Sequence, residues 1–362
     1  MKLQHTILVT LCVSLNVYIG NAAKTIGSND VANNTAPQQN PVGNTQKSEP
    51  TEAESTNEEN DPYHTGTPFS VHKFPINDIE KVKSKTDSGE IYVIGNSTAN
   101  EVKVKLYITG NNGIAVSKLE IERRLKAYYN LDIDVNGKVI KAHAKETDLH
   151  VPDNQRLRIA FVIYTPEKIS INLCSDQGDV IIKQINGTIV AKTVQGNVNA
   201  ENCKGTTQNS RTAVAIGLYT DQGNIVIKNL EGNVKALTDA GDIWGNTLKG
   251  YLFAKTDAGN VTLTGIAGSV SAISDAGTVS VRMTEVTGKV SASSDSDDVT
   301  LELPKNGKYA LDLKCSESLS AIGLTNNFVA QISKRKWVQG KYNGGGFSVK
   351  VRAEENIWFS LV

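Results

Sequence analysis

The sequence has little of what charge-driven binding and cofactor chemistry require. Among its 362 residues, 38 Lys and Arg balance 38 Asp and Glu, and only 5 His and 4 Cys are present. The charges balance and no block of five or six basic residues occurs, so we expect no nucleic-acid partner. The motifs G-x-S-x-G and H-E-x-x-H and the P-loop are also missing. The sequence therefore predicts a protein that is not an enzyme and has no resident organic cofactor.

Long hydrophobic runs are missing as well, except at the start of the chain. Residues 7–19 are mostly apolar and residues 20–22 are small, which predicts a signal peptide over residues 1–22. The run contains Ser14 and Asn16 and is too short for a comfortable membrane span. We therefore expect a secreted, extracellular protein, located on the cell surface or, in a bacterium, in the periplasm.

Cysteine is too scarce for a disulfide framework. After the predicted signal peptide only Cys174, Cys203 and Cys315 remain, so at least one of them is unpaired within a monomer. The sequence does not decide which one, nor whether a cysteine joins two chains. The oligomeric state is therefore left open.

Large apolar residues are almost absent from residues 23–67, which are rich in Asn, Thr, Pro, Glu and Ser. This composition cannot bury a core and predicts a disordered spacer. Residues 68–168 show strand-like alternation and are expected to form a β region that caps the repeats that follow. Within this region, Asn136-Gly137 predicts a two-residue hairpin turn, whereas residues 114–129 fit either a helix or a strand.

Glycine, in contrast, is periodic. Along the middle of the chain a glycine occurs at every ninth position, except that Val214 stands at one of these positions. These glycines are Gly178, Gly187, Gly196, Gly205, Gly223, Gly232, Gly241, Gly250, Gly259, Gly268 and Gly277. Two types of nine-residue unit alternate, so the true repeat is eighteen residues long. A fixed short period is typical of a stacked repeat.

The repeat also has the alternation of a strand with one buried face. Val261 and Leu263 are apolar, whereas Thr262 and Thr264 are polar. Two strands of about five residues and two turns account for one repeat, after which the chain advances about 4.8 Å and begins again. The sequence therefore predicts an all-β fold, a β-solenoid with about 18 residues per rung.

Regular rungs are expected over residues 169–303, and residues 304–362 are expected to supply C-terminal rungs and a cap. The extra nine residues near 205–213 should loop out without displacing a rung, and the extra two residues before Gly288 should form a bulge. Open solenoid ends must be covered to prevent edge pairing, and we expect C-terminal aromatic residues to do this. They are Trp337, Tyr342, Phe347, Trp358 and Phe359.

One turn motif, [ST]-D-x-G, recurs through the chain. It stands at Thr86-Asp87-Ser88-Gly89, Ser175-Asp176-Gln177-Gly178, Thr220-Asp221-Gln222-Gly223, Thr238-Asp239-Ala240-Gly241, Thr256-Asp257-Ala258-Gly259 and Ser274-Asp275-Ala276-Gly277. With the strand that follows each turn, it resembles a β-strand-repeat family of unknown function whose members are labelled candidate adhesins. The likeness covers about residues 80–350 and implies a right-handed, single-stranded β-solenoid. It implies no catalytic residue.

Four aspartates of this motif, Asp221, Asp239, Asp257 and Asp275, should lie one rung apart on one edge. Neighbouring carboxylates about 4.8 Å apart repel by roughly 1 kcal/mol in water. One interpretation is that each carboxylate accepts a hydrogen bond within its own turn. The other is that Ca²⁺ binds along this edge, as it does between the turns of calcium-binding β-rolls.

A parallel row of hydroxyl residues, Thr238, Thr256 and Ser274, also has two interpretations. The hydroxyls either bond the turns or face a repeating surface such as mineral or glycan. Because the motif is confined to one edge, this edge is where the sequence would place a ligand.

We expect the protein to be a secreted, non-enzymatic scaffold or adhesion module of the cell surface or extracellular matrix. Its partner, a surface glycan, a matrix component or a protein, is not identified by the sequence. One alternative is a Ca²⁺- or mineral-associated matrix protein that uses the Asp-lined edge. Another is a saccharide-binding or saccharide-cleaving β-helix. Cleavage needs clustered charged groups on the middle rungs, whereas the outward positions there are mostly Thr, Ser, Asn and Lys.

Overall fold

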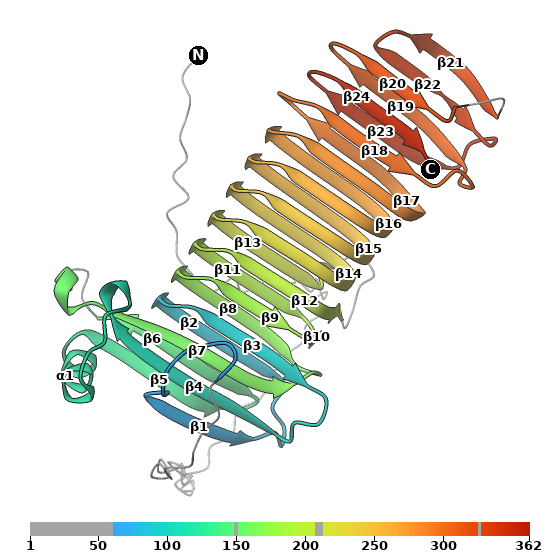
Figure 1. Cartoon of the computed structure of the whole chain (residues 1–362). Helices are drawn as coiled ribbons and strands as arrows, with labels where there is room; N and C mark the ends of the chain where they lie inside the picture. The colour runs from blue at the N-terminus through green and yellow to red at the C-terminus, as the bar shows by residue number, and fades with distance from the viewer. Residues whose placement is uncertain (1–60, 148–150, 207–212, 325–326) are drawn as a thin grey trace, which may run out of the picture. The chain divides into compact units, whose positions relative to one another are not determined.

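The fold is taken from a computed structural model, in which β-strands dominate and stack side by side (Figure 1). It describes residues 61–147, 151–206, 213–324 and 327–362. The predicted signal peptide (1–22) and most of the predicted spacer (23–67) lie outside the described residues.

The middle of the chain is built from strands that pair in parallel at a constant offset. From β14 (Ile225–Ala240) to β15 (Ile243–Ala258), and from β15 to β16 (Val261–Ala276), every paired residue faces the residue eighteen positions further on. The predicted β-solenoid with eighteen-residue rungs is therefore confirmed. Figure 1 shows these rungs as the evenly spaced yellow and orange strands.

Each of these rungs is one long bent strand, whereas the sequence predicted two short strands with a turn between them. The bend begins at a residue with left-handed backbone, such as Asn229 with φ 51° or Thr247 with φ 59°. Pairing resumes immediately, because Leu230 pairs with Leu248 just after the bend. The corner therefore changes the direction of the strand without interrupting the ladder for more than one residue.

The interior of the stack is lined by columns of equivalent apolar side chains. Valine, isoleucine and leucine fill most columns, and one column consists mainly of fully buried alanines, with Leu218 between Ala191 and Ala236. Its members include Ala191, Ala236, Ala254, Ala272 and Ala292. Cys203 pairs with Leu230 in the column at the corner and is free and buried. The core is therefore narrow where alanine occupies this column.

The strands before these rungs follow the same scheme with one interruption. They are β8 (Ser170–Gln177), β9 (Val180–Lys183), β10 (Asn186–Gly187), β11 (Ile189–Gln195), β12 (Val198–Gly205) and β13 (Ile216–Gln222). Ile189 pairs with Ile216, an offset of twenty-seven residues instead of eighteen. The chain therefore has nine extra residues between these two rungs, as expected, and residues 207–212 of this insertion lie outside the described residues. The predicted bulge is present where β16 pairs with β17 (Val279–Ser294) with shifts of register.

The N-terminal end of the stack is closed by antiparallel strands. On one face, β1 (Ser70–Pro75) pairs with β4 (Glu101–Gly110) and β4 with β7 (Leu157–Pro166), before β7 pairs in parallel with β3 (Ile91–Asn96). On the other face, the hairpin of β5 (Tyr129–Asn136) and β6 (Val139–Glu146) precedes β2 (Lys81–Ser88). The register places the hairpin turn at Gly137-Lys138, one residue later than predicted, with Gly137 at φ 57°.

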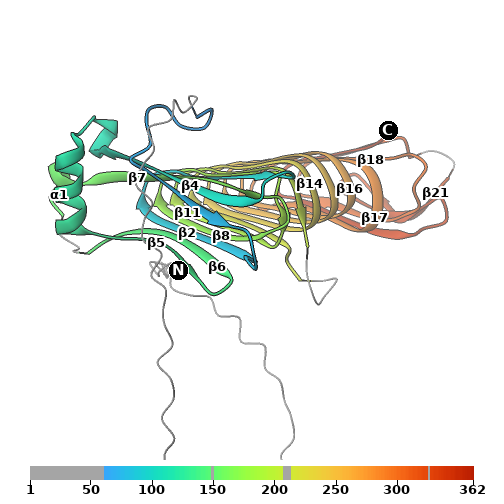
Figure 2. The ribbon, with the colours of Figure 1, turned by 90° about the horizontal axis from the view of Figure 1, so that it is seen from below.

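The segment that fitted both a helix and a strand forms helix α1 (Lys118–Tyr128). The hydroxyl of Ser117 accepts a hydrogen bond from the Glu120 backbone N–H at 3.3 Å, which satisfies one free donor at the helix start. Glu120 also pairs with Arg123 and Arg124 at 2.7 Å. These local bonds favour the helix over a strand, and Figure 2 shows it beside the first strands of the stack.

The C-terminal end departs from chain order. β17 and β18 (Val299–Leu303) are followed in the stack by β23 (Phe347–Ala353) and β24 (Ile357–Leu361), the last strands of the chain. The strands that precede them in the chain lie further out. They are β19 (Tyr309–Cys315), β20 (Leu319–Ile322), β21 (Phe328–Lys334) and β22 (Trp337–Tyr342). β21 and β22 run antiparallel and close this end.

The five C-terminal aromatic residues therefore do not act together as a cap. Trp337 and Tyr342 belong to the antiparallel strand β22. Phe359 is buried in the core of the inserted rung, whereas Trp358 and Phe347 are exposed. The prediction is wrong for these three because alternate residues of a strand face opposite sides, and the inserted strands are rungs of the stack.

Candidate functional site

The hydroxyl side chains of the turn edge point inward. Six of them donate a hydrogen bond to the carbonyl of the glycine one rung earlier, at 2.7–2.9 Å. They are Thr193, Thr220, Thr238, Thr256, Ser274 and Ser294, and all six are buried. The hypothesis that Thr238, Thr256 and Ser274 face a mineral or glycan surface is therefore wrong, because the ladder between rungs uses them.

A second polar column on this edge was not recognised from the sequence. The residue after each turn glycine uses its side-chain oxygen to accept the backbone N–H of the equivalent residue one rung later. Asp179 accepts from Asn197 at 2.8 Å, Asn197 from Asn224 at 2.9 Å and Asn224 from Asp242 at 2.8 Å. The preference for Asp or Asn after the glycine was visible, but only the pairing of rungs reveals its cause.

The four candidate metal-binding aspartates do form a row on the turn edge. Their neighbours pair from rung to rung, and Asp239 and Asp257 are exposed while Asp221 and Asp275 are half-buried. Lys255 partly neutralises the row, because its Nζ lies 2.8 Å from Asp257 Oδ1 and 3.1 Å from Asp275 Oδ2. Burial raises the pKa of Asp239, and the charges of Asp221 and Asp257 raise it further. Within the row, the Asp239 carboxylate is therefore repelled by the carboxylates of Asp221 and Asp257.

Among the described residues, a group of three carboxylates that could converge on a metal ion lies elsewhere. Side-chain oxygens of Asp297, Asp298 and Glu355 lie within 4.8 Å of one another. Asp298 is already engaged, because its Oδ1 accepts the Asn356 backbone N–H and side-chain amide, both at 2.9 Å. Calcium binding along the four-aspartate row remains a prediction.

Calcium titration of the chain tests that prediction. If Ca²⁺ binds the row, saturating Ca²⁺ should stabilise the folded state by about 1–3 kcal/mol, and Mg²⁺ should do so less. Asp239→Asn should reduce this gain and, without Ca²⁺, raise stability by a few tenths of a kcal/mol, since the folded state disfavours the charged form. A melting temperature that is unchanged by Ca²⁺ contradicts a calcium edge.

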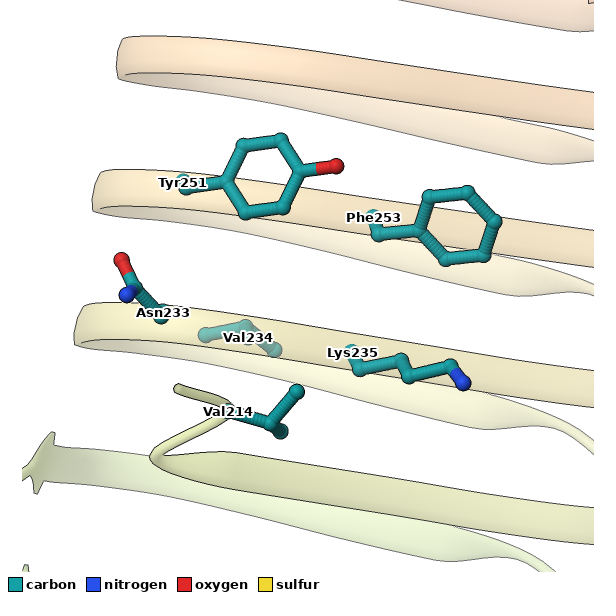
Figure 3. Close-up of a pocket in the computed structure, with 6 residues that line it drawn as sticks. All are labelled: Val214, Asn233, Val234, Lys235, Tyr251 and Phe253. Atoms are coloured by element: carbon teal, nitrogen blue, oxygen red, sulfur yellow. The ribbon is translucent and has the colours of Figure 1, made fainter. Parts of the chain in front are cut away.

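A shallow depression lies on the outward face of β14 and β15 (Figure 3). It has a volume of about 250 Å³ and is lined by Val214, Asn233, Val234, Lys235, Tyr251 and Phe253. Asn233 pairs with Tyr251 and Lys235 with Phe253, so each polar residue lies one rung below an aromatic one. The Lys235 Nζ lies 6.0 Å from the centre of the Phe253 ring.

This depression was not predicted, although one signal was present. In the stretch Tyr251-Leu252-Phe253-Ala254, the alternation places Leu252 and Ala254 inside and both aromatic rings outside. Tyr251 is 41% exposed. Outward aromatic side chains in a repeat whose outward positions are mostly Ser, Asn and Lys are the signal that could have been used.

A buried carboxylate lies near the N-terminal end of the described chain. The Asp61 side chain is 1% exposed and lies 3.2 Å from Lys105 Nζ, and it accepts bonds from the Tyr164 hydroxyl at 2.9 Å and the Tyr63 backbone N–H at 3.0 Å. The Tyr63 ring also contacts the rings of Tyr92 and Tyr164. Asp61 is therefore packed although it lies before the predicted boundary at residue 68, because a polar composition does not reveal one buried anchor.

We expect this anchor to hold residues 61–67 against β4 and β7. Although burial opposes the charged form, the Tyr63 N–H, Tyr164 and Lys105 together lower the pKa of Asp61 below 3.8. The stabilisation is thus present above pH 3.8 and is lost as the pH falls through the lowered pKa. Asp61→Asn should cut the hydrogen-exchange protection of residues 61–67 at least ~10-fold at neutral pH, because it removes the negative charge that pairs with Lys105.

The exposed ion pair of Asp153 and Arg156 offers the control, since Asp153→Asn should leave that protection unchanged. Equal protection in the wild type and in Asp61→Asn would show that the carboxylate does not hold the segment.

The described part of the chain contains no helix with the length and apolar character of a membrane span. The sequence profile of the Toastrack DUF4097 family matches residues 71–356. No curated protein matches the chain.

Similar solved structures have low sequence identity and low structural overlap. A candidate cell adhesion protein from Clostridium sporogenes is 15% identical with a TM-score of 0.22, covering 81% of this chain and 98% of that one. A candidate adhesin from Bacteroides fragilis is 12% identical with a TM-score of 0.36, covering 81% and 96%. A candidate lipid-binding protein from Parabacteroides distasonis is 12% identical with a TM-score of 0.25, covering 81% and 93%.

Proposed function

Because the chain belongs to the Toastrack DUF4097 family, whose profile matches residues 71–356, we propose that it is a secreted, non-enzymatic binding module. In this proposal the stacked rungs are a rigid scaffold of the cell surface or extracellular matrix. The outward side chains of the scaffold bind the partner.

One observation carries the proposal: the repeated polar residues are already used between rungs. The Thr and Ser hydroxyls bond glycine carbonyls, and the Asp and Asn side chains bond the N–H groups of the next rung. The repeated polar residues therefore stabilise the scaffold. We expect the partner to bind the outward residues that differ from rung to rung. The signal-like residues 1–22 support secretion.

An enzyme that cleaves saccharides along its flank is the competing function. Such a mechanism needs two carboxylates that face one bound sugar from opposite sides of the scissile bond. The depression on β14 and β15 is lined instead by Asn233, Lys235 and apolar or aromatic residues. This lining supports binding over hydrolysis.

Fractionation of the native producing cells tests the proposal, together with retention of the purified chain on those cells and their matrix. We expect the protein outside the cytosol and expect saturable retention of the purified chain. Recovery from the cytosol, or no saturable retention, overturns the proposed function.

A further inference from the structure

The outward face of β14 and β15 carries a pair of aromatic rings that the stack does not require. Tyr251 and Phe253 are two residues apart on one strand, so both project from the same face (Figure 3). One rung further on, Ser269 pairs with Tyr251 and Ser271 pairs with Phe253. Since serine occupies the same columns in the next rung, packing between rungs does not explain the two rings.

The rings are flanked by hydrogen-bonding and charged groups. Asn233 and Lys235 lie one rung below them, and Ser269 and Ser271 one rung above. Within the described part of the chain, the Lys235 ammonium contacts only the Phe253 ring, whereas Lys255 on the same face is paired with Asp257 and Asp275. The Lys235 ammonium therefore has no carboxylate partner within the described chain.

This combination matches the chemistry of a sugar that bears a negative charge. One face of a pyranose ring presents mainly C–H groups, which pack against an aromatic ring, while its hydroxyls bond amides and other hydroxyls at the rim. An apolar peptide would leave the Lys235 ammonium desolvated without a carboxylate partner. A carboxylate or sulfate on the sugar would pair with Lys235.

We infer that Tyr251, Phe253, Asn233 and Lys235 form a binding site for an anionic pyranose unit of a polysaccharide. This inference rests on the proposed function and specifies its ligand. The site has a volume of about 250 Å³, which fits a single sugar unit of a longer chain better than a whole oligosaccharide.

Calorimetric titration of the full chain with three galactose-based probes tests the inference. The probes are oligogalacturonate, its methyl ester and a sulfated galactan oligosaccharide. We expect at least one of the two anionic probes to bind with an affinity that falls as salt rises, and the neutral ester to bind more weakly. Oligogalacturonate and sulfated galactan distinguish a carboxylate from a sulfate as the charged group.

Two variants taken from the chain's own rungs locate the site. The double variant Tyr251→Ser and Phe253→Ser copies the next rung and should weaken binding by about 10- to 30-fold with an unchanged melting temperature. Lys235→Gln should weaken it by only about 2- to 5-fold and reduce the salt dependence, because an exposed ion pair contributes little. Trp244→Thr is the control, since Trp244 is 41% exposed, belongs to the other half of the same strand and pairs with Thr262 in the next rung.

Trp244→Thr should bind as the wild type does. The inference is overturned if neither anionic probe binds, if the ester binds equally well, or if Trp244→Thr loses binding while the double serine variant keeps it. If the double serine variant is still retained on cells and matrix, the proposed binding function is supported, but the inference that Tyr251 and Phe253 form the binding site is wrong.

Discussion

Gly268→Ala should destabilise the solenoid by about 3–5 kcal/mol, the largest effect we expect from any single methyl group in the repeat. A Cβ at this position would lie 1.8 Å from the carbonyl oxygen of Gly250, one rung earlier, and Gly268 has φ 149°. The clash is with backbone, so no side chain can move away. Urea denaturation followed by circular dichroism measures the loss.

Gly288 provides the matched control, since it is the corresponding glycine of the bulged rung. A Cβ there would meet only the Ser269 side chain, at 3.0 Å, and Gly288 does not have a positive φ. Gly288→Ala should therefore change stability by less than about 1 kcal/mol. Equal stability losses in the two variants would contradict the view that close approach of glycine backbones sets the period.

Thr256→Val should destabilise the protein by about 2 kcal/mol, although it preserves the shape of the side chain. Thr256 is fully buried, and its hydroxyl donates to the Gly241 carbonyl at 2.8 Å. Valine removes the donor and leaves a buried carbonyl without this partner, which costs more than a hydrogen bond at the surface. The same urea denaturation measures it.

Thr256→Ser is the control variant, because it keeps the hydroxyl and loses only the methyl group. Ser274 occupies the same column and donates to Gly259 at 2.7 Å, so serine can make this bond. We expect Thr256→Ser to retain most of the stability that Thr256→Val loses. If both variants lose the same amount, the hydroxyl ladder contributes nothing.

The repeat in the sequence was sufficient to predict the rungs. The period of eighteen fixes which residues pair, and alternation fixes which residues face inward. The same logic predicted the nine-residue insertion near residues 205–213 and the bulge before Gly288. Each of these predictions depends only on neighbours at a fixed separation along the chain.

Features without a fixed separation could not be predicted. The insertion of β23 and β24 next to β17 and β18 joins segments about sixty residues apart, and no periodic signal marks it. Asp61 is buried through contacts with Lys105 and Tyr164, which are also distant in sequence. The turn aspartates were visible, but the sequence could not show that the adjacent hydroxyls and Asx side chains close the ladder.

The candidate site shows the same limit. The regular motif drew attention to Asp221, Asp239, Asp257 and Asp275, whereas the depression is made by Tyr251 and Phe253, which break the pattern of their columns. In a repeat protein the periodic residues describe the scaffold. Departures from the period on the outward face are therefore the better place to look for a ligand.

Fractionation of the native protein tests the central claim of a secreted binding module most directly. The protein should be recovered in the secreted, surface-bound or matrix fractions and should be absent from the cytosol. Recovery from the cytosol would contradict the claim.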